Sequence, residues 1–301
     1  LTPNRQTMTQ HLPFPTGRIA VVSITRHGIA LAGRVVAALP GARLFAPEKF
    51  AAEANVAAPG AAACYAGKTA EQIPILFSNF DGIVAIVSLG AMVRLVAPHL
   101  GRKESDPGVV VIDEAGRFVI PMLSGHLGGA NALAGVIAGA LDATAVLTTA
   151  SDARQTLAVD LLGRELGWAF EASHDEIVRA SAAMVNDEPV ALVQEAGSPD
   201  WWRGHANGRN GPLPANLHPF TRLEDVDIAR FGAVLWISQR ALPPELAAGL
   251  AGKRVIYRPP VVVVQPAPYY SYRDGPYYRR GKHYHHHYYY GHRRHRDDDD
   301  N

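Results

Sequence analysis

The residues best suited to chemistry lie in one glycine-rich turn, SGHLGGAN at residues 124–131. Because the turn joins a strand-like run to a helical one, we expect it at the carboxyl end of a sheet. His126 is the side chain in this turn whose unperturbed pKa lies near neutrality, so it could take a proton from water or give one to a leaving group. The amides of Gly128 and Gly129, where a following helix would begin, could bind a carboxylate or an oxyanion. Asn131 could cap that helix or contact a ligand. The alternative is that His126 and Asn131 only satisfy backbone groups in a tight turn.

Two further polar groups belong to the same candidate site. Ser124 lies two residues before His126, but its Ser-Gly-His context is not the Gly-x-Ser-x-Gly elbow, so the motif alone does not identify a serine nucleophile. The run TTASD at 148–152 ends a strand-like segment, and α/β sheets bind ligands at such strand ends. Thr149 and Asp152 are therefore candidates, although either could instead be a helix cap.

Charged side chains in two other loops could bind anions. Arg94 lies just after SLGA at 88–91, a second strand-to-helix loop from which a guanidinium could hold a carboxylate in a bidentate manner. Lys103 precedes a Pro-Gly turn, and Asp113 lies at the tip of a hairpin. The alternative for all three is an ordinary solvated charge.

No metal site is predicted. Cys64, the single cysteine, lies in an alanine-rich loop without a nearby histidine. Six histidines between 283 and 295 could hold Ni, Cu or Zn, but their spacing defines no closed geometry. Such His/Tyr-rich runs also arise from a misjoined gene model or a tag-like extension. We therefore expect neither a bound metal nor a separate cofactor.

The elements that must position these residues alternate between strand and helix. Apolar runs predict strands at 19–24, 42–46, 82–87, 109–112, 117–120 and 145–148. Helical spacing predicts helices at 28–39, 69–80, 92–96 and 132–141, and we expect 47–68 to be a loop with at most one helical turn. The fold class is α/β, with a mostly parallel sheet covered by helices on both faces.

Four segments follow from changes in character along the chain. They are a disordered leader at 1–18, an amino-terminal α/β domain at 19–154, a smaller middle α/β domain at 155–260 and a low-complexity His/Tyr-rich tail at 261–301. The middle domain is expected to hold a helix at 157–166 and strands at 190–193 and 233–237. The tail has no apolar periodicity and is expected to be disordered.

Composition narrows the function classes. The 301 residues are 48% apolar and 19% charged, which suits one large or two ordinary globular domains. A net charge of +1 gives no reason to expect nucleic acid or an acidic membrane surface as a partner. The longest run of low charge, 125–150, is too rich in Gly and Ala for a membrane span, and one cysteine gives no disulfide framework. We expect a cytoplasmic protein.

Four motifs in order resemble the CbiG family of anaerobic cobalamin biosynthesis, the cobalt-precorrin-5A hydrolases. They are SLGAMVR at 88–94 with Ala97-Pro98, the stretch from Lys103 through Asp106-Pro107 to Asp113-Glu114, SGHLGGAN at 124–131, and TTASD at 148–152. A weaker likeness runs through 157–260 to a Tyr-Arg-Pro-Pro junction. Family members continue there with a third domain, whereas this chain runs into Gln265-Pro266 and the tail, so we expect that domain to be absent.

The resemblance implies a substrate and a reaction. Family members open the δ-lactone that joins a ring acetate to the C20 meso carbon of a cobalt-bound tetrapyrrole, and the C20 unit leaves as acetaldehyde. Cobalt would then arrive within the substrate. This chemistry needs a proton donor or base, a stabiliser for charge on the lactone oxygen, and groups that bind the substrate's carboxylates.

From residue type, we expect each candidate to take one of these roles. His126 would be the acid or base, the amides of Gly128 and Gly129 the anion donors, and Asp152 or Asp113 the group that orients a proton donor. Arg94 and Lys103 would bind peripheral carboxylates. Ser124, Asn131 and Thr149 complete the predicted site.

Two other functions stay open. The chain could be a tetrapyrrole carrier or subunit that binds without catalysis and needs a separate protein to supply the third domain. It could also bind a nucleotide through its Gly-Gly loop. That second reading is disfavoured because no Gly-x-Gly-x-x-Gly follows the first strand and no Walker lysine is present.

Overall fold

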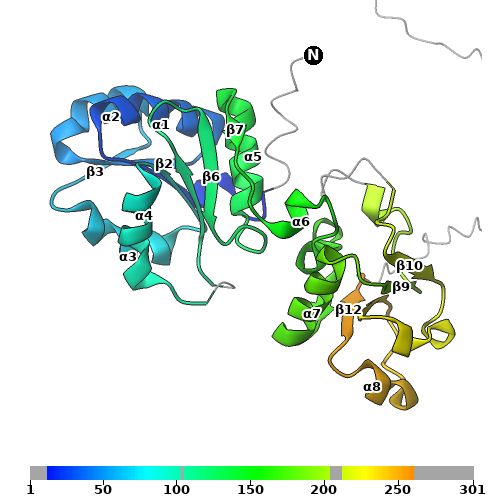
Figure 1. Ribbon diagram of the computed structural model, residues 1–301. Coiled ribbons are helices and arrows are strands. Elements are labelled where there is room, and N and C mark those ends of the chain that lie inside the picture. The colour runs from blue at the N-terminus through cyan, green and yellow to red at the C-terminus, as the bar shows by residue number, and fades with distance from the viewer. Residues whose placement is uncertain (1–11, 103–104, 204–211, 261–301) are drawn as a thin grey trace, which may run out of the picture. The chain divides into compact units, whose positions relative to one another are not determined.

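A computed structural model describes residues 12–102, 105–203 and 212–260 of the chain. Lys103, most of the predicted leader and the predicted tail lie outside these ranges. The described residues form two sheets, each with its own helices and its own core (Figure 1).

The first sheet has seven strands in the order β3-β2-β1-β4-β5-β6-β7. The strands are β1 (Ile19–Ser23), β2 (Arg43–Pro47), β3 (Ala62–Tyr65), β4 (Gly82–Ile86), β5 (Gly108–Ile112), β6 (Phe118–Leu123) and β7 (Thr144–Ala145). β1 to β5 are parallel, whereas β6 pairs antiparallel with β5 and β7 follows the direction of β6. The predicted α/β class with a mostly parallel sheet is confirmed.

Helices cover both faces of this sheet (Figure 1). They are α1 (Arg26–Ala38), α2 (Ala51–Ala57), α3 (Thr69–Asn79), α4 (Leu89–Val96) and α5 (Ala130–Leu141). The short α6 (Ala150–Ala153) follows β7 and belongs to neither core of this sheet. The strand residues alternate between two cores, so that Val84 packs with α1, α2 and α5 while Ile83 packs with α3 and α4. Burial on both faces explains why β4, β5 and all but the last residue of β1 are continuous apolar runs.

Three predictions for this part of the chain need correction. The segment 47–68 holds α2 and the edge strand β3 instead of a loop, because alanine-rich residues can pack at small spacing without a strong apolar pattern. The strand predicted at 145–148 is only the two-residue β7. Residues 12–18, assigned to the leader, include a 3-10 turn (Thr16–Arg18), and Phe14 packs against the core.

The second sheet has five strands in the order β10-β9-β11-β12-β8. They are β8 (Ala169–Glu171), β9 (Val190–Gln194), β10 (Leu217–Phe220), β11 (Ala233–Ile237) and β12 (Arg254–Arg258). All are parallel except β8, which pairs antiparallel with β12. α7 (His174–Val185) packs on one face and α8 (Pro244–Leu250) on the other.

The helix predicted at 157–166 is wrong. The structure has two 3-10 turns there, Val159–Leu161 and Arg164–Leu166, because Gly163 and Gly167 both take positive φ and interrupt any longer helix. The predicted domain boundary at 154 and 155 lies between the last strand of the first sheet and the first strand of the second. Among the described residues, no helix is long and apolar enough to cross a membrane.

Candidate functional site

The turn at 124–131 lies at the edge of the first sheet where β1, β4 and β5 begin. β6 runs against these strands, and its last residue, Leu123, pairs with Val109 near the start of β5. Gly108, the first residue of β5, lies so close that an added Cβ would come within 2.3 Å of the carbonyl oxygen of Gly128. The turn therefore does not lie at the carboxyl edge of the parallel strands, where the sequence placed it.

The local backbone explains the shape of the turn. Ser124 and Gly129 both have positive φ, at 55° and 76°, and α5 begins directly after Gly129. The amides of Gly129 and Ala130 donate to the carbonyls of His126 and Ser124, at 2.9 and 3.2 Å. These two hydrogen bonds restrain the backbone of the turn at His126.

The side chain of Asp152 collects three polar partners. Asn131 Nδ2 donates to Asp152 Oδ2 at 2.7 Å and also lies 3.1 Å from Thr149 Oγ1. The Thr149 hydroxyl donates to the same carboxylate oxygen. His126 Nε2 lies 3.5 Å from that oxygen. The structure therefore brings together four of the predicted site residues.

These contacts argue against the capping alternative. Thr149 is the N-cap residue of α6, but its side chain makes no capping hydrogen bond to the helix backbone. Asn131 lies in the first turn of α5, and its side-chain amide is directed at Thr149 and Asp152. A capping side chain accepts a hydrogen bond from a backbone amide of the helix. Asn131 and Thr149 instead bind other side chains, as residues that hold a functional group in place do.

Two residues of the cluster were not predicted from the sequence. Ser151 Oγ lies 3.1 Å from His126 Nε2, and Asp160 Oδ1 lies 3.3 Å from His126 Nδ1. Asp160 belongs to the 3-10 turn at 159–161, whose Val159 carbonyl accepts a 2.8 Å hydrogen bond from the buried hydroxyl of Tyr257. The one signal for Asp160 was an acidic residue inside the apolar run VDLL at 159–162.

His126 is held as a cation by this surrounding. Hydrogen bonding to Asp152 and then to Asp160 raises the pKa of His126 to about 9, although burial opposes the shift. The same pairing with His126 holds the pKa of Asp152 below its usual value. Near neutral pH the ring is therefore an imidazolium that carries a proton on both nitrogens, so it can give a proton but cannot take one.

Other predicted donors are used differently. The amide of Gly129 is occupied by the His126 carbonyl, whereas the Gly128 amide donates to nothing within the described part of the chain. The Ser124 hydroxyl is buried without a hydrogen-bond partner in the structure, and no contact joins it to His126. Ser124 instead contributes its carbonyl, which accepts from Ala130 at 3.2 Å.

Arg94 and Asp113 do not join the cluster. Asp113 follows β5 and accepts from the amides of Arg117 and Phe118, at 2.8 and 2.6 Å, so it shapes the hairpin turn at the opposite edge of the sheet. Arg94 is an exposed residue of α4 whose Nη1 donates to the Gly90 carbonyl one turn earlier, at 3.1 Å. Lys103 lies outside the described residues.

The described residues contain no group of three or more His, Cys, Asp or Glu side chains arranged to hold a metal ion. The histidine-rich tail, the other candidate for metal binding, lies outside these residues.

Comparison with known proteins points to one family. Residues 71–152 match the model described as "Cobalamin synthesis G N-terminal", and residues 157–259 match "Cobalamin biosynthesis central region". Together the two matched ranges cover more than half of the chain. The first contains every member of the His126 cluster except Asp160, which lies in the second.

Named relatives agree with these matches. The chain is 38% identical over 252 residues to a cobalt-precorrin-5A hydrolase of Priestia megaterium, which covers 82% of this chain and 64% of the relative. It is 34% identical over 229 residues to the cobalt-precorrin-5A hydrolase of Salmonella typhimurium, covering 76% and 60%. The chain thus spans less than two thirds of these relatives' length.

A solved structure gives a looser match. The crystal structure of a cobalamin biosynthesis protein G homolog from Sulfolobus solfataricus is 20% identical, with a TM-score of 0.44 over 84% of this chain and 62% of that one.

Proposed function

Because the chain belongs to the cobalamin synthesis G (CbiG) family, we propose that it hydrolyses the δ-lactone of cobalt-precorrin-5A and releases the C20 unit as acetaldehyde, giving cobalt-precorrin-5B. The names of the two relatives support this activity. The observation that carries the proposal within this chain is the imidazolium of His126, held between Asp152 and Asp160.

His126 acts as the general acid in this proposal. When water adds to the lactone carbonyl and the ring C–O bond breaks, negative charge develops on the departing oxygen. The proton on Nε2 passes to that oxygen, which gives a carboxylic acid and a hydroxyl group on the C20 unit, and the ring is reprotonated from solvent afterwards. Acetaldehyde leaves when this hydroxyl gives up its proton to solvent and the bond between its carbon and the macrocycle breaks, with the electron pair passing to the macrocycle. A proton held at a pKa of about 9 is still acidic enough to neutralise an alkoxide, which is far more basic.

The neighbours of His126 position it. Asp160 fixes Nδ1, and Asp152, itself held by Asn131 and Thr149, keeps the ring charged. Ser151 Oγ, 3.1 Å from Nε2, shares the proton on that nitrogen. The free amide of Gly128 would bind an anionic group of the substrate beside the ring.

Cobalt enters with the substrate in this scheme, and the chain needs no cofactor of its own. We place the reaction in the cytoplasm, which the single cysteine supports, since a chain with one thiol gains nothing from an oxidising compartment.

The test is the release of acetaldehyde. The purified chain is incubated anaerobically with cobalt-precorrin-5A, and acetaldehyde is measured by its reduction with NADH and alcohol dehydrogenase. Release above the no-protein control is the expected result. Tight binding of the tetrapyrrole without acetaldehyde would overturn the proposal and would instead favour a carrier.

Substitutions within and outside the His126 cluster test whether His126 is the proton donor. We expect His126→Asn to lower the rate at least about 100-fold, because general acid catalysis typically contributes a factor of this size. Ser151→Ala should cost less, about tenfold, since the ring keeps its proton. His99→Asn, which removes a histidine outside the cluster, should leave the rate unchanged. A normal rate in His126→Asn would refute the assignment.

A further inference from the structure

The second sheet carries a separate polar cluster at the point where its strand order reverses. From β9 the chain moves outward to β10, then crosses back to β11 and continues the other way to β12. In a parallel sheet the crevice at the carboxyl ends of such a strand pair is where ligands bind. Glu195 directly follows β9 there, and Ser238 to Arg240 directly follow β11.

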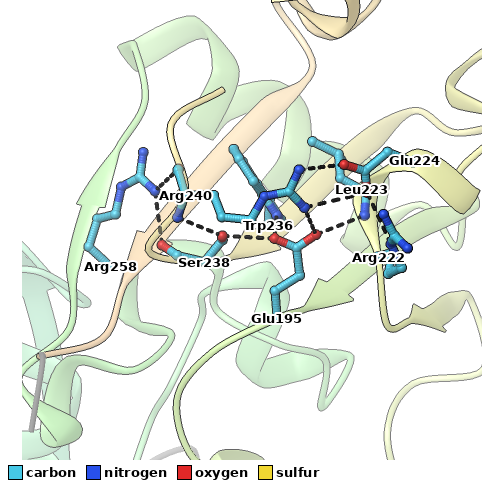
Figure 2. Close-up of polar contacts among 8 residues, drawn as sticks. All are labelled: Glu195, Arg222, Leu223, Glu224, Trp236, Ser238, Arg240 and Arg258. Atoms are coloured by element: carbon cyan, nitrogen blue, oxygen red, sulfur yellow. Dashed lines mark hydrogen bonds and ion pairs between the residues drawn. The ribbon is translucent and has the colours of Figure 1, made fainter. Parts of the chain in front are cut away.

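Glu195 is the fixed centre of this cluster (Figure 2). Its side chain is 9% exposed. Oε1 accepts from the Leu223 amide at 3.0 Å and Oε2 accepts from Trp236 Nε1 at 3.0 Å. Oε2 also accepts from Ser238 Oγ at 2.8 Å. These donors offset the cost of burying the charge and hold the carboxylate rigidly.

The fourth donor to Glu195 is Arg240, and this contact orients the arginine. Arg240 Nη1 lies 2.9 Å from Glu195 Oε1, while Nη2 is directed at Glu224, a carboxylate on the outer side (Figure 2). The side chain of Arg240 is 46% exposed, and that of Glu224 is 34% exposed. Nη1 thus donates to the buried Glu195 at 2.9 Å and also lies 3.4 Å from Glu224 Oε2. Nη2 donates to Glu224 and to no other side chain of the described residues.

Two further arginines, Arg258 and Arg222, lie next to Arg240 and Glu224. Arg258 Nη1 donates to the carbonyls of Ser238 and Arg240, at 2.9 and 2.6 Å, and so fixes the loop that carries Arg240. Arg222 Nε lies 3.5 Å from Glu224 and is well exposed. Glu224 therefore contacts both Arg222 and Arg240, the second of which it shares with Glu195, and hydrogen bonding to Arg240 lowers the pKa of Glu224 to about 2.

An apolar cavity is lined in part by residues that are next to members of this cluster in the sequence. It has a volume of about 670 Å³ and is lined by Trp201, Trp202, Phe220 and Gln194, among others. Gln194 immediately precedes Glu195, and Phe220 ends β10 two residues before Arg222. Ligand sites commonly combine an apolar wall of this size with a few oriented polar groups.

We propose that Arg240 and Arg222 form a binding site for a carboxylate of an organic anion with an aromatic body, and that Glu224 occupies the place of that carboxylate when the ligand is absent. Resting on the proposed function, the ligand is the tetrapyrrole substrate, whose peripheral acids bind the arginines while its ring system lies against the tryptophan-lined cavity. An incoming carboxylate exchanges with Glu224 on the outer edge of Arg240, and Glu224 is released to solvent.

The proposed exchange predicts the direction in which ligand affinity changes when Glu224 is replaced, whereas a purely structural ion pair predicts no change. If Glu224 competes with the ligand, then Glu224→Gln frees both arginines, and binding becomes tighter. If the Arg240–Glu224 pair only stabilises the fold, the same change leaves binding unaltered. Glu224 lies on the surface, where a lost ion pair costs little stability, so the variant should fold.

The probe is uroporphyrin, an aromatic tetrapyrrole with carboxylate side chains, titrated into the full chain while tryptophan fluorescence is followed. We expect Glu224→Gln to tighten binding about threefold or more, and Arg240→Gln to weaken it about tenfold. Arg179→Gln, which removes an exposed arginine of α7, is the matched control and should bind as the wild type does. Circular dichroism establishes that each variant is folded.

Binding that is equal in wild type, Glu224→Gln and Arg240→Gln would overturn the site. So would weaker binding in Glu224→Gln. Because uroporphyrin has no lactone to hydrolyse, this failure is distinct from a failure of the proposed reaction: a chain that releases acetaldehyde yet shows no effect of Glu224 or Arg240 on binding would keep its activity assignment and lose this site.

Discussion

At the scale of single residues, the charge of His126 decides what the candidate site can do. A histidine with one carboxylate partner is a common general base, but His126 has Asp152 at one ring nitrogen and Asp160 at the other. The two partners keep the ring protonated near neutral pH. The sequence left an acid or a base open at this position, and the raised pKa of His126 is the reason that we propose the acid.

The raised pKa also links His126 to stability. A folded-state pKa of about 9, compared with 6.5 when unfolded, stabilises the fold fully below about pH 6.5, and the contribution is lost as the pH rises through about 9. We expect the wild type to lose about 2 kcal/mol more unfolding free energy than His126→Asn across this range, less than the full shift would give because water reaches the ring.

Urea unfolding of both proteins at a series of pH values measures this difference directly. Groups other than His126 titrate in both proteins, so their contributions cancel in the comparison. An equal loss of stability in the two proteins would show that the ring is not held as a cation in the folded state.

Some residues of the His126 cluster could be predicted from the sequence and others could not. His126, Asn131, Thr149 and Asp152 were found because polar residues in turns after apolar runs stand out. Asp160 was missed because its contact with His126 depends on a turn that no local pattern predicts. Arg94 and Asp113 lie outside the His126 cluster for a different reason, which is that β6 runs antiparallel to β5.

At the scale of elements, the reversal of β6 relocates the site. The sequence predicted a hairpin between β5 and β6 correctly, yet the turn after β6 was assigned to the carboxyl edge of the parallel strands. A hairpin returns the chain to the edge where β5 began, so the turn at 124–131 and the turn at Asp113 must lie at opposite edges. The predicted hairpin was therefore enough to place the turn at 124–131 at the correct edge of the sheet.

The close approach of β5 to the turn gives a test at this scale. In Gly108→Ala the new Cβ would meet the Gly128 carbonyl at 2.3 Å, a backbone atom that can move only if the turn moves. We expect a loss of about 2 kcal/mol in unfolding free energy and a reduced rate of acetaldehyde release. Thermal unfolding and the acetaldehyde assay measure the two effects.

Gly135→Ala is the matched control. Gly135 lies within α5, where an added Cβ meets nothing within 4 Å, so this change should be neutral or stabilise the chain by up to about 1 kcal/mol. Equal stability of the Gly108 and Gly135 variants would mean that the turn does not pack on β5 as described.

The parts of the fold that could be predicted were those with a strong burial pattern. β1, β4, β5 and β11 are buried throughout and β9 in all but its last residue, and a short apolar run in the sequence predicted each of them. The helix α2 and the strand β3 are built largely from alanine, which fits either structure, so tertiary packing alone decided them. At 157–166 the helical pattern was overridden by two glycines with positive φ.

At the scale of the whole chain, chemistry and recognition are assigned to different sheets. The proposed proton donor follows β6 of the first sheet, and the proposed carboxylate site follows β9 and β11 of the second. A net charge of +1 fits this division, because anionic groups are held by a few oriented donors and not by a broad basic surface. Two separate groups of residues can then be tested independently, one by reaction rate and the other by binding.

The pH dependence of acetaldehyde release tests the central role of His126 most directly. The rate at low concentrations of cobalt-precorrin-5A, which reports the free protein, is measured from about pH 6 to pH 10 for the wild type and Asp152→Asn. An essential imidazolium requires a rate that is level near neutrality and falls as the pH rises through about 9. Loss of the Asp152 charge should move that fall to lower pH. A wild-type rate that instead climbs between pH 7 and 9 would show that the neutral ring is the active form, and the assignment of His126 as the proton donor would be wrong.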